Sequence, residues 1–187
     1  MGLTIRSADY PALSDSELVE LARDDLEAFG ELVRRHQDFV FGAAMRIVRN
    51  PVTAQDVAQD AFIRAYKALP DFRGDAQFRS WVYRIASNLA LNTVQRNREH
   101  ATDLMPETET SRHGRPAHQT EMSELRTAIE NAVDELNDEL RIPLVLREFG
   151  GLSYQEIADE TGLPLNTVRT RILRGRRALA EKLEEWR

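Results

Sequence analysis

The side chains of this sequence that could do chemistry are concentrated in two basic segments, and the first lies near the C-terminus. Between Asn166 and Arg177, one asparagine, two threonines and five arginines occur within 12 residues. Arginine can pair with guanine, asparagine with adenine, and threonine can contact the thymine methyl group. The other arginines can hold phosphates and fix the register. The segment therefore fits a helix that reads the major groove of DNA, or else an ordinary helix with a basic outer face.

The second segment combines aromatic and basic residues. Six of the 13 aromatic residues fall between Phe62 and Tyr83, and five lysines or arginines are interleaved with them up to Arg84. Rings on which bases stack, beside cations that hold the backbone, can bind single-stranded nucleic acid or a base turned out of a duplex. The same rings recur at helical spacing, so we expect at least half of them to be buried. The best surface candidates are residues 72–75, Arg79, Arg84, Asn88 and Asn92.

Residues suited to catalysis or metal binding are scarce. The chain has no cysteine, which excludes disulfides, thiolate zinc sites and cysteine nucleophiles. Its four histidines show no His-x-x-x-His spacing, and there is neither a glycine-rich phosphate loop nor a Gly-x-Ser-x-Gly motif. Asp56 and Asp60 could in principle share Mg²⁺, but two ligands from one helix make a poor cage. We therefore expect no catalytic residue, no metal and no cofactor.

Charge is distributed unevenly along the chain, whose net charge is −6. Residues 61–98 hold 7 basic and 2 acidic residues, and residues 164–182 hold 6 basic and 1 acidic. Residues 121–163 hold 3 basic and 11 acidic residues. Polyanion binding depends on the local potential within a Debye length of ~10 Å, so either basic segment could bind DNA. The acidic residues would repel DNA and restrict its contacts to the basic segments.

The hydrophobic pattern is helical nearly throughout, which predicts an all-α protein. Ser14 and Glu17 have the form of a capping box at the start of the first helix. Thr53 can cap a later helix that ends at Pro70. Further helices are expected at residues 26–48, 78–98, 122–136 and 139–149.

Residues 102–119 interrupt this pattern. They contain Pro106, Gly114 and Pro116 and no aromatic residue, which is typical of a linker. We therefore expect two small helical domains, at residues 14–101 and 120–187, after an N-terminal extension of residues 1–13. No stretch is apolar enough for a signal peptide or a membrane helix, so a cytoplasmic location is expected.

The second domain is predicted to contain a helix-turn-helix unit. Ser153 and Glu156 form a second capping box, Gly162 suits a tight turn with positive φ, and a longer helix follows to about residue 185. At 100° per residue, the apolar side chains of that helix separate from a polar face. The core side holds Leu165, Val168, Ile172, Gly175 and Leu179, and the opposite face holds Asn166, Thr170, Leu173, Arg174 and Arg177.

The two basic segments resemble parts of one protein family. Asp56 to Phe62 and Phe72 to Asn88 are similar to conserved region 2 of bacterial extracytoplasmic-function (ECF) sigma factors, and residues 151–171 resemble region 4. The resemblance covers about residues 14–183. It implies a protein, monomeric when free, that binds core RNA polymerase, recognises two promoter elements, promotes DNA melting at stress- or signal-responsive genes, and is restrained by an anti-sigma factor.

The resemblance also implies roles for three sets of residues. Recognition of the minus-thirty-five element is implied for Asn166, Thr167, Arg169, Thr170, Arg171, Leu173, Arg174 and Arg177. Recognition of the minus-ten element is implied for Phe72, Arg73, Gly74, Asp75, Phe78, Arg79, Trp81, Arg84, Asn88 and Asn92. Binding to the coiled-coil clamp of the largest polymerase subunit is implied for Asp56, Gln59, Asp60, Phe62, Arg64 and Lys67.

Two features depart from the family pattern. Asn166 stands where many relatives have glycine, and the first dozen residues match no motif.

Two other functions are open at this point. A stand-alone helix-turn-helix regulator would bind duplex DNA tightly without polymerase. A helical adaptor would hold another protein and never contact DNA.

Overall fold

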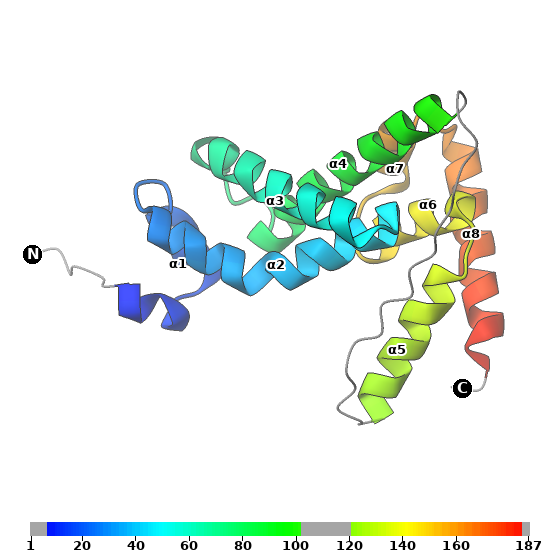
Figure 1. Ribbon diagram of the computed structural model, residues 1–187, viewed down its shortest axis with the longest axis horizontal. Coiled ribbons are helices and arrows are strands. Elements are labelled where there is room, and N and C mark those ends of the chain that lie inside the picture. Colours follow the sequence, from blue (N-terminus) through cyan, green and yellow to red (C-terminus); the bar gives the residue numbers. More distant parts are fainter. Residues whose placement is uncertain (1–6, 102–120, 185–187) are drawn as a thin grey trace, which may run out of the picture.

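The computed structural model describes residues 7–101 and 121–184. Within these ranges it consists of eight α-helices, two short 3₁₀ helices and their connecting loops, with no strand (Figure 1). The all-α prediction is therefore confirmed for this part of the chain. None of the helices in these ranges is long and apolar enough to cross a membrane. The predicted linker, residues 102–119, lies outside the described residues.

The N-terminal half is a bundle of four α-helices: α1 (Asp15–Leu21), α2 (Leu26–Val48), α3 (Pro51–Ala68) and α4 (Phe78–Ala101). The short 3₁₀ helix η1 (Ser7–Ala12) precedes them, and η2 (Leu69–Asp71) follows α3. Leu18, Leu32, Val40 and Val82 belong to their buried apolar cluster, and none of their surface is exposed. This core holds α3 and α4 against α2 and thereby positions the loop between α3 and α4.

Capping residues explain where the helices of this half begin. Ser14 and Glu17 form the predicted capping box, and α2 has the predicted bounds. The predicted start of α3 was wrong, because Asn50 caps the helix and its side chain accepts a hydrogen bond from the Thr53 amide. Pro51 then occupies the first turn, where a missing amide hydrogen does no harm. Helix α4 ends three residues later than predicted, at Ala101.

The C-terminal half contains α5 (Glu121–Asp134), α6 (Asp138–Glu148), α7 (Tyr154–Thr161) and α8 (Leu165–Lys182). These agree with the predicted elements to within about three residues, and α8 ends at Lys182 rather than near residue 185. Helix α6 packs across α8, and α7 packs beside α8. At Gly175, α8 approaches α6 so closely that a Cβ on this residue would lie 3.2 Å from a methyl carbon of Leu144.

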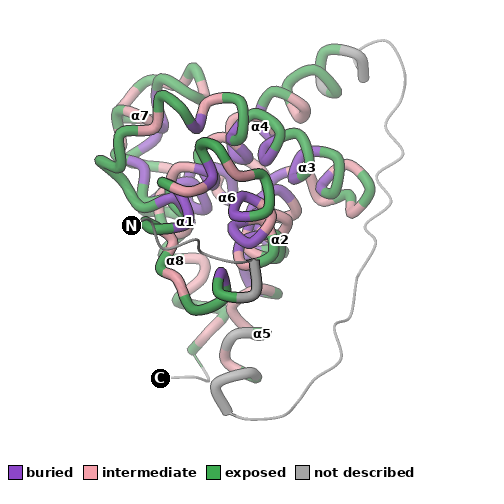
Figure 2. The backbone as a smooth tube through the Cα atoms, turned by 90° about the vertical axis from the view of Figure 1, so that its left-hand side faces the viewer, coloured by how far each residue is buried: buried purple, intermediate pink, exposed green. Residues whose placement is uncertain are grey.

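The two halves pack against each other and share one buried apolar cluster. Ile47 and Leu91 from the first half belong to the same cluster as Val145 and Ile157 from the second. The buried segments of α2, α4 and α6 lie together in the middle of the molecule (Figure 2). The sequence predicted two domains and left their relative placement open; in this structure the two are in direct contact.

The C-terminal end of α2 carries most of the polar contacts between the halves. Arg46 pairs with Glu130 at 3.3 Å, and the Arg49 side chain donates to the Leu136 carbonyl at 3.0 Å and to the Asp134 carbonyl. Arg49 itself has a φ of 58°, a left-handed conformation that ends α2. The α2 carbonyls that lack helical partners here favour cations, which suits both arginines.

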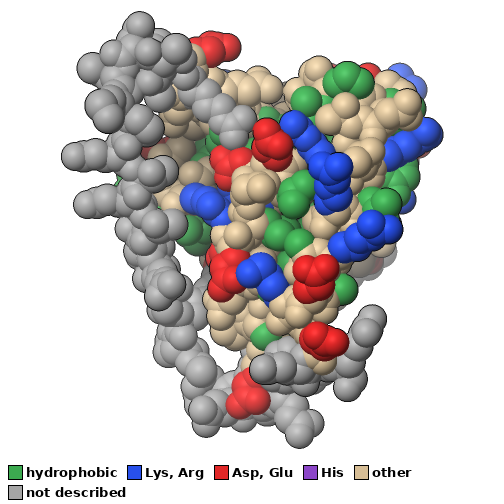
Figure 3. Space-filling model, turned by 90° about the vertical axis from the view of Figure 1, so that its right-hand side faces the viewer, with side chains coloured by type: hydrophobic (Ala, Val, Ile, Leu, Met, Phe, Trp, Pro, Cys, Tyr) green, Lys and Arg blue, Asp and Glu red, His purple; other side chains and the backbone are tan. Residues whose placement is uncertain are grey.

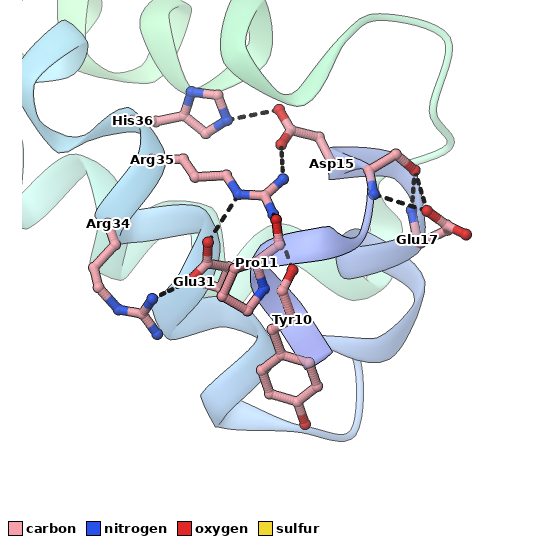
Figure 4. Close-up of polar contacts among 9 residues, drawn as sticks. Tyr10, Pro11, Asp15, Glu17, Glu31, Arg34, Arg35 and His36 are labelled. Atoms are coloured by element: carbon pink, nitrogen blue, oxygen red, sulfur yellow. Dashed lines mark hydrogen bonds and ion pairs between the residues drawn. The ribbon is translucent and has the colours of Figure 1, made fainter. Parts of the chain in front are cut away.

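The N-terminal segment, which matched no sequence motif, is fastened to α2 by Arg35 (Figure 4). The Arg35 guanidinium donates to the Tyr10 carbonyl at 2.9 Å and to the Pro11 carbonyl at 3.1 Å. It also pairs with Asp15 at 3.1 Å and with the buried carboxylate of Glu31 at 2.9 Å. Burial, the largest single influence, lowers the pKa of Arg35, but the hydrogen bonds and ion pairs with Glu31 and Asp15 together outweigh it and raise the pKa above its ordinary value. Residues 7–12 are therefore an integral part of the first bundle.

Replacing Arg35 with leucine should lower the free energy of unfolding by about 2–3 kcal/mol, because the buried Glu31 would keep only the exposed Arg34 as its partner and the Tyr10 and Pro11 carbonyls would lose their donor. Arg34→Leu is the matched control, since Arg34 also pairs with Glu31 but its side chain is 64% exposed. That change should cost less than about 1 kcal/mol. Urea denaturation of both variants measures the difference, and equal losses would contradict the anchoring role of Arg35.

Candidate nucleic-acid interface

The turn between α7 and α8 has the geometry of a helix-turn-helix. Ser153 caps α7 with the predicted capping box, in which the Glu156 carboxylate accepts from the Ser153 amide at 2.7 Å. This hydrogen bond is the main cause that holds the pKa of Glu156 below its usual range. Gly162 ends α7 with a φ of 68°, which confirms that the turn needs positive φ. Helix α8 then starts at Leu165 and crosses α6.

Helix α8 has the two faces that its sequence predicts. Val168, Ile172 and Gly175 are buried, and Leu165 and Leu179 pack at the edge of the same cluster. On the opposite side, Leu173 is 49% exposed although it is a large apolar residue. The surrounding polar residues of this face are also exposed: Asn166, Arg169, Thr170, Arg174 and Arg177.

Three residues on or beside the predicted DNA-reading face of α8 are partly buried or already paired with an acidic residue. Thr167 is half-buried, and Arg171 is partly buried and pairs with Glu139 at 3.5 Å. Arg176 pairs with Glu148 at 2.7 Å. Figure 3 views the side of the molecule on which α8 lies and shows Lys and Arg side chains gathered there, flanked by Asp and Glu. The arginines on the central face of α8 are thus unpaired among the described residues, whereas Arg171 and Arg176 beside that face form ion pairs with Glu139 and Glu148.

The loop between α3 and α4 presents an aromatic cluster at its base. Phe72 stacks on Trp81 with ring centroids 4.5 Å apart and planes tilted by 30°. Arg23 of the α1–α2 connection donates to the Phe72 carbonyl at 3.1 Å, which holds the loop against the bundle. Arg73 and Asp75 are exposed, and Gly74 turns the chain with a φ of 77°. Phe72 and Trp81 are both partly accessible, so this pair can offer a ring surface to a base.

Helix α4 carries the remaining predicted minus-ten residues, in different surroundings. Phe78 is only 3% exposed and supports Phe72 and Trp81 from beneath, so its own ring is inaccessible in this structure. Arg79 is exposed and lies over the ring of Phe39, 3.8 Å from its centroid. Arg84 and Asn88 face α7, and Asn92 is exposed.

The outer face of α3 holds the residues predicted to bind polymerase. The polar members of that set, Asp56, Gln59, Asp60, Arg64 and Lys67, are all exposed. Phe62 is only 8% exposed and lines a hollow between α2 and α3, together with Gln37, Asp38 and Gln59.

Two exposed apolar residues of α3 were missed by the sequence analysis. Val52 is 71% exposed and Ile63 is 52% exposed, among the polar residues of the same face. Large apolar side chains on an exposed helix face are typical of a contact with another protein. The signal in the sequence was weak, because both residues could equally have belonged to the core.

Asp56 and Asp60, the pair that could in principle share Mg²⁺, are both exposed on α3. Among the described residues, no three His, Cys, Asp or Glu side chains come together in a way that could hold a metal ion. The pair is better explained as part of the exposed polar face of α3.

Comparisons with known proteins agree with this geometry. The family model described as Sigma-70 region 2 matches residues 32–100, and Sigma-70, region 4 matches residues 126–179. The RNA polymerase sigma-H factor of Pseudomonas aeruginosa is 39% identical over 181 residues, which cover 91% of this chain and 94% of that protein. The chain belongs to the ECF family of RNA polymerase sigma factors. The ECF RNA polymerase sigma-E factor of Escherichia coli is equally similar, with 39% identity over 92% of this chain and 95% of the relative.

Solved structures share the fold of this sigma factor. CnrH in complex with the cytosolic domain of CnrY is 28% identical, with a TM-score of 0.52 over 91% of this chain and 97% of that one. The sigma factor RpoE of Bartonella quintana, in complex with the anti-sigma factor NepR, matches with a TM-score of 0.62 over 83% and 96% of the two chains. At 20% identity, that second match concerns the fold alone.

The family assignment gives the two halves their names. Region 2 covers most of α2 together with α3 and α4, and region 4 runs from within α5 to near the end of α8. Sigma factors are the subunits that give transcription initiation its specificity. The two surfaces described above, the loop with α4 and the outer face of α8, therefore lie one in each region.

Neighbouring residues of α8 test the assignment of its two faces. Ile172→Ala should lower the free energy of unfolding by about 2–4 kcal/mol, because it leaves a cavity in the shared core. Leu173→Ala should change it by no more than about 0.5 kcal/mol, because Leu173 faces solvent. Urea denaturation of the two variants gives the comparison. A larger loss for Leu173→Ala would mean that α8 is turned the other way.

Proposed function

We propose that this ECF sigma factor binds core RNA polymerase through α3, recognises the minus-ten element with the α3–α4 loop and α4, and recognises the minus-thirty-five element with α8. It then promotes melting of the promoter. It carries no catalytic residue of its own and works in the cytoplasm, where the polymerase is. The functional domains correspond to residues 14–101, onto which η1 packs, and residues 120–187, joined by the linker 102–119.

The exposed face of α8 supports duplex reading. Asn166 and Arg174 can make bidentate contacts with base edges, and Leu173 can contact a thymine methyl group. Arg169 and Arg177 lie beside them and can bind phosphates. The N-terminal end of α8 is oriented by the tight turn at Gly162, which is how a recognition helix enters the major groove.

The aromatic cluster supports capture of unpaired bases. Phe72 and Trp81 form a partly exposed stacked pair, and the exposed cations Arg73 and Arg79 lie close in sequence. Stacking on rings stabilises a strand by about 1–3 kcal/mol per base regardless of its identity. Because this stacking free energy is gained only from unpaired bases, it favours the melted promoter over the duplex. Melting is the step that initiation requires.

The exposed face of α3 supports docking to the polymerase. Its apolar residues Val52 and Ile63 would be buried in the complex, and the polar residues around them would set the register. The hollow that Gln59 and Phe62 line offers a recess beside this face. An anti-sigma factor is a further expected partner, since the sigma factor RpoE of Bartonella quintana, which has the same fold, is solved in complex with the anti-sigma factor NepR.

The observation that carries this proposal is that one chain exposes two chemically different surfaces: the Asn, Thr and Arg face of α8, which suits duplex DNA, and the Phe72–Trp81 ring pair beside exposed arginines, which suits single strands. The test is transcription with purified core polymerase on fragments of the native genome, with mapping of transcript starts. Addition of the chain should produce discrete starts preceded by two shared sequence elements. No starts beyond those of core polymerase, with tight binding of the chain alone to a symmetric duplex site, would favour the stand-alone regulator instead.

Removing one arginine of the α8 face should weaken promoter recognition. Arg174→Ala or Arg177→Ala should reduce the affinity of the holoenzyme for the minus-thirty-five element by about 1–3 kcal/mol if the side chain pairs with a base. Arg176→Ala is the control, since Glu148 already neutralises that flanking arginine. Competition binding with promoter fragments measures the effect. Unchanged affinity in both test variants would count against α8 as the reader.

The ring of Phe72 should matter more for opening than for binding. Phe72→Ala should slow formation of the open complex about tenfold, because a stacking partner worth about 1–3 kcal/mol is lost, and should leave the closed complex nearly unchanged. Phe72→Tyr keeps the ring and should open promoters at close to the normal rate. Stopped-flow fluorescence of a base analogue in the minus-ten element follows the reaction. Equal opening rates for all three proteins would refute the role.

A further inference from the structure

The helix that precedes the region 2 match is packed firmly against the rest of the first bundle. The family model begins at residue 32, but Leu18, Val19 and Ala22 lie before it and are at most 4% exposed. They belong to the same buried cluster as Val82 of α4. Close packing of this kind leaves a helix little freedom to shift against its neighbours. The end of α1, and the connection to α2 that follows it, are therefore held in place.

One side chain of that connection reaches the loop between α3 and α4. The Arg23 guanidinium donates from Nη2 to the Phe72 carbonyl at 3.1 Å, across 49 positions of the sequence. The same group pairs with Glu20 of α1 at 3.2 Å. Arg23 therefore restrains the backbone of the residue whose ring the proposed function offers to unpaired bases.

The loop itself has few other restraints. Residues 73–77 are all exposed, and none of their backbone amides donates to a backbone carbonyl in the described part of the chain. Gly74 has a φ of 77°, in a region where glycine keeps its conformational freedom. Among the described residues, the Arg23 contact is the only hydrogen bond that ties residues 72–77 to anything beyond the adjoining helices. The position of the Phe72 backbone thus depends strongly on this bond.

The ring of Phe72 is held from the other side by α4. It stacks on Trp81 with centroids 4.5 Å apart, and it meets Phe78 edge-on with centroids 6.5 Å apart. Phe78 in turn lies 5.6 Å from the His36 ring, which a contact of 2.7 Å with the Asp15 carboxylate of α1 holds in place (Figure 4). Helices α1 and α2 therefore brace the floor of the ring cluster as well as its rim.

The connection that carries Arg23 is tied to η1 as well. The Tyr10 hydroxyl donates to the Asp25 carboxylate, which also accepts from the Glu27 amide at 2.8 Å at the start of α2. Tyr10 is only 3% exposed, so its ring is locked in the core of the first bundle. Together, η1, α1 and the connection to α2 form a rigid support for Arg23.

A ring that is already ordered captures a base at a lower entropic cost. A flexible loop loses conformational freedom at the moment of binding, whereas a loop ordered by folding has lost it beforehand. The advantage concerns only states with unpaired bases, because duplex DNA offers no free base face to stack on Phe72. It therefore acts on promoter opening and leaves the first binding to duplex DNA unchanged.

From these contacts we propose that Arg23 is a positioning residue for promoter melting. It holds the Phe72 backbone so that the ring pair of Phe72 and Trp81 is ordered before unpaired bases arrive, and it contacts no base itself. This role rests on the proposed function of Phe72 in binding the minus-ten element. Through Arg23, η1 and α1 take part in initiation although both precede the region 2 match.

A measurement without DNA tests the positioning directly. The chain has two tryptophans, so a Trp186→Phe background leaves Trp81 as the only one. Arg23→Ala should raise the rate constant for acrylamide quenching of that indole about twofold, because a released Phe72 ring uncovers it. The matched control is Glu20→Gln, which removes the ion pair and keeps the carbonyl bond. Equal quenching in the variant and the control would overturn the positioning role.

Opening kinetics of the holoenzyme test the functional consequence. Arg23→Ala should slow formation of the open complex about threefold, since the Phe72 ring stays present but is no longer ordered. The affinity of the closed complex and its salt dependence should not change, because Arg23 neutralises no phosphate. Arg23→Lys keeps a donor for this single bond and should restore most of the rate. In a Phe72→Ala background, Arg23→Ala should have no further effect, because it acts through that ring.

The outcomes separate this role from the function on which it rests. Slow opening in Phe72→Ala with a normal rate in Arg23→Ala would overturn the positioning role and leave the minus-ten role intact. Normal opening in both variants would overturn the minus-ten role of Phe72 as well. Additive effects of the two changes, or a weaker salt dependence in Arg23→Ala, would make Arg23 a direct DNA contact instead. A slow Arg23→Ala variant that unfolds at much lower urea than Glu20→Gln, and that Arg23→Lys does not correct, would reduce the effect to stability and overturn the role.

Discussion

Burial of apolar surface where α2 and α4 meet α6 and α7 is the interaction on which the other features depend. Neither half is large, and a small helical bundle buries only part of its apolar surface by itself. Ile47, Leu91, Val145 and Ile157 share one cluster, so each half completes the core of the other in the free chain. That packing brings the acidic residues of α7 to the basic face of α4. It also leaves the outer faces of α3 and α8 at the surface, where partners can reach them.

Local signals explain why most of the fold could be predicted. The bounds of α2 follow from its apolar period, and both capping boxes follow from residues three apart in the sequence. The start of α3 was misplaced because Asn50 and Thr53 are both good caps, and only the position of Pro51 in the first turn decides between them. The docking of η1 onto α2 could not be predicted, because the Arg35 contacts join residues twenty or more positions apart.

The candidate site was predictable to a different degree in each region. On α8 the period of 3.6 residues is enough to place Ile172 on the buried face and Leu173 on the exposed face. In the aromatic segment, spacing alone could not decide which rings are accessible, and Phe62 and Phe78 prove to be buried. The pairing of Arg84 with Glu156 spans 72 positions, and no local rule foresees it. Charge segregation along the chain was the one hint, since the acidic residues of region 4 lie against the cations of region 2.

We infer that this chain is a specificity subunit that acts only as part of RNA polymerase. The most direct measurement is gel filtration of the purified chain with purified core polymerase, with the subunits of each fraction quantified by mass spectrometry. We expect co-elution at one copy per core, and loss of that co-elution when Ile63 on the exposed face of α3 is replaced by a charged residue. Separate elution of the native chain and the core at micromolar concentrations would show that the chain is not a polymerase subunit.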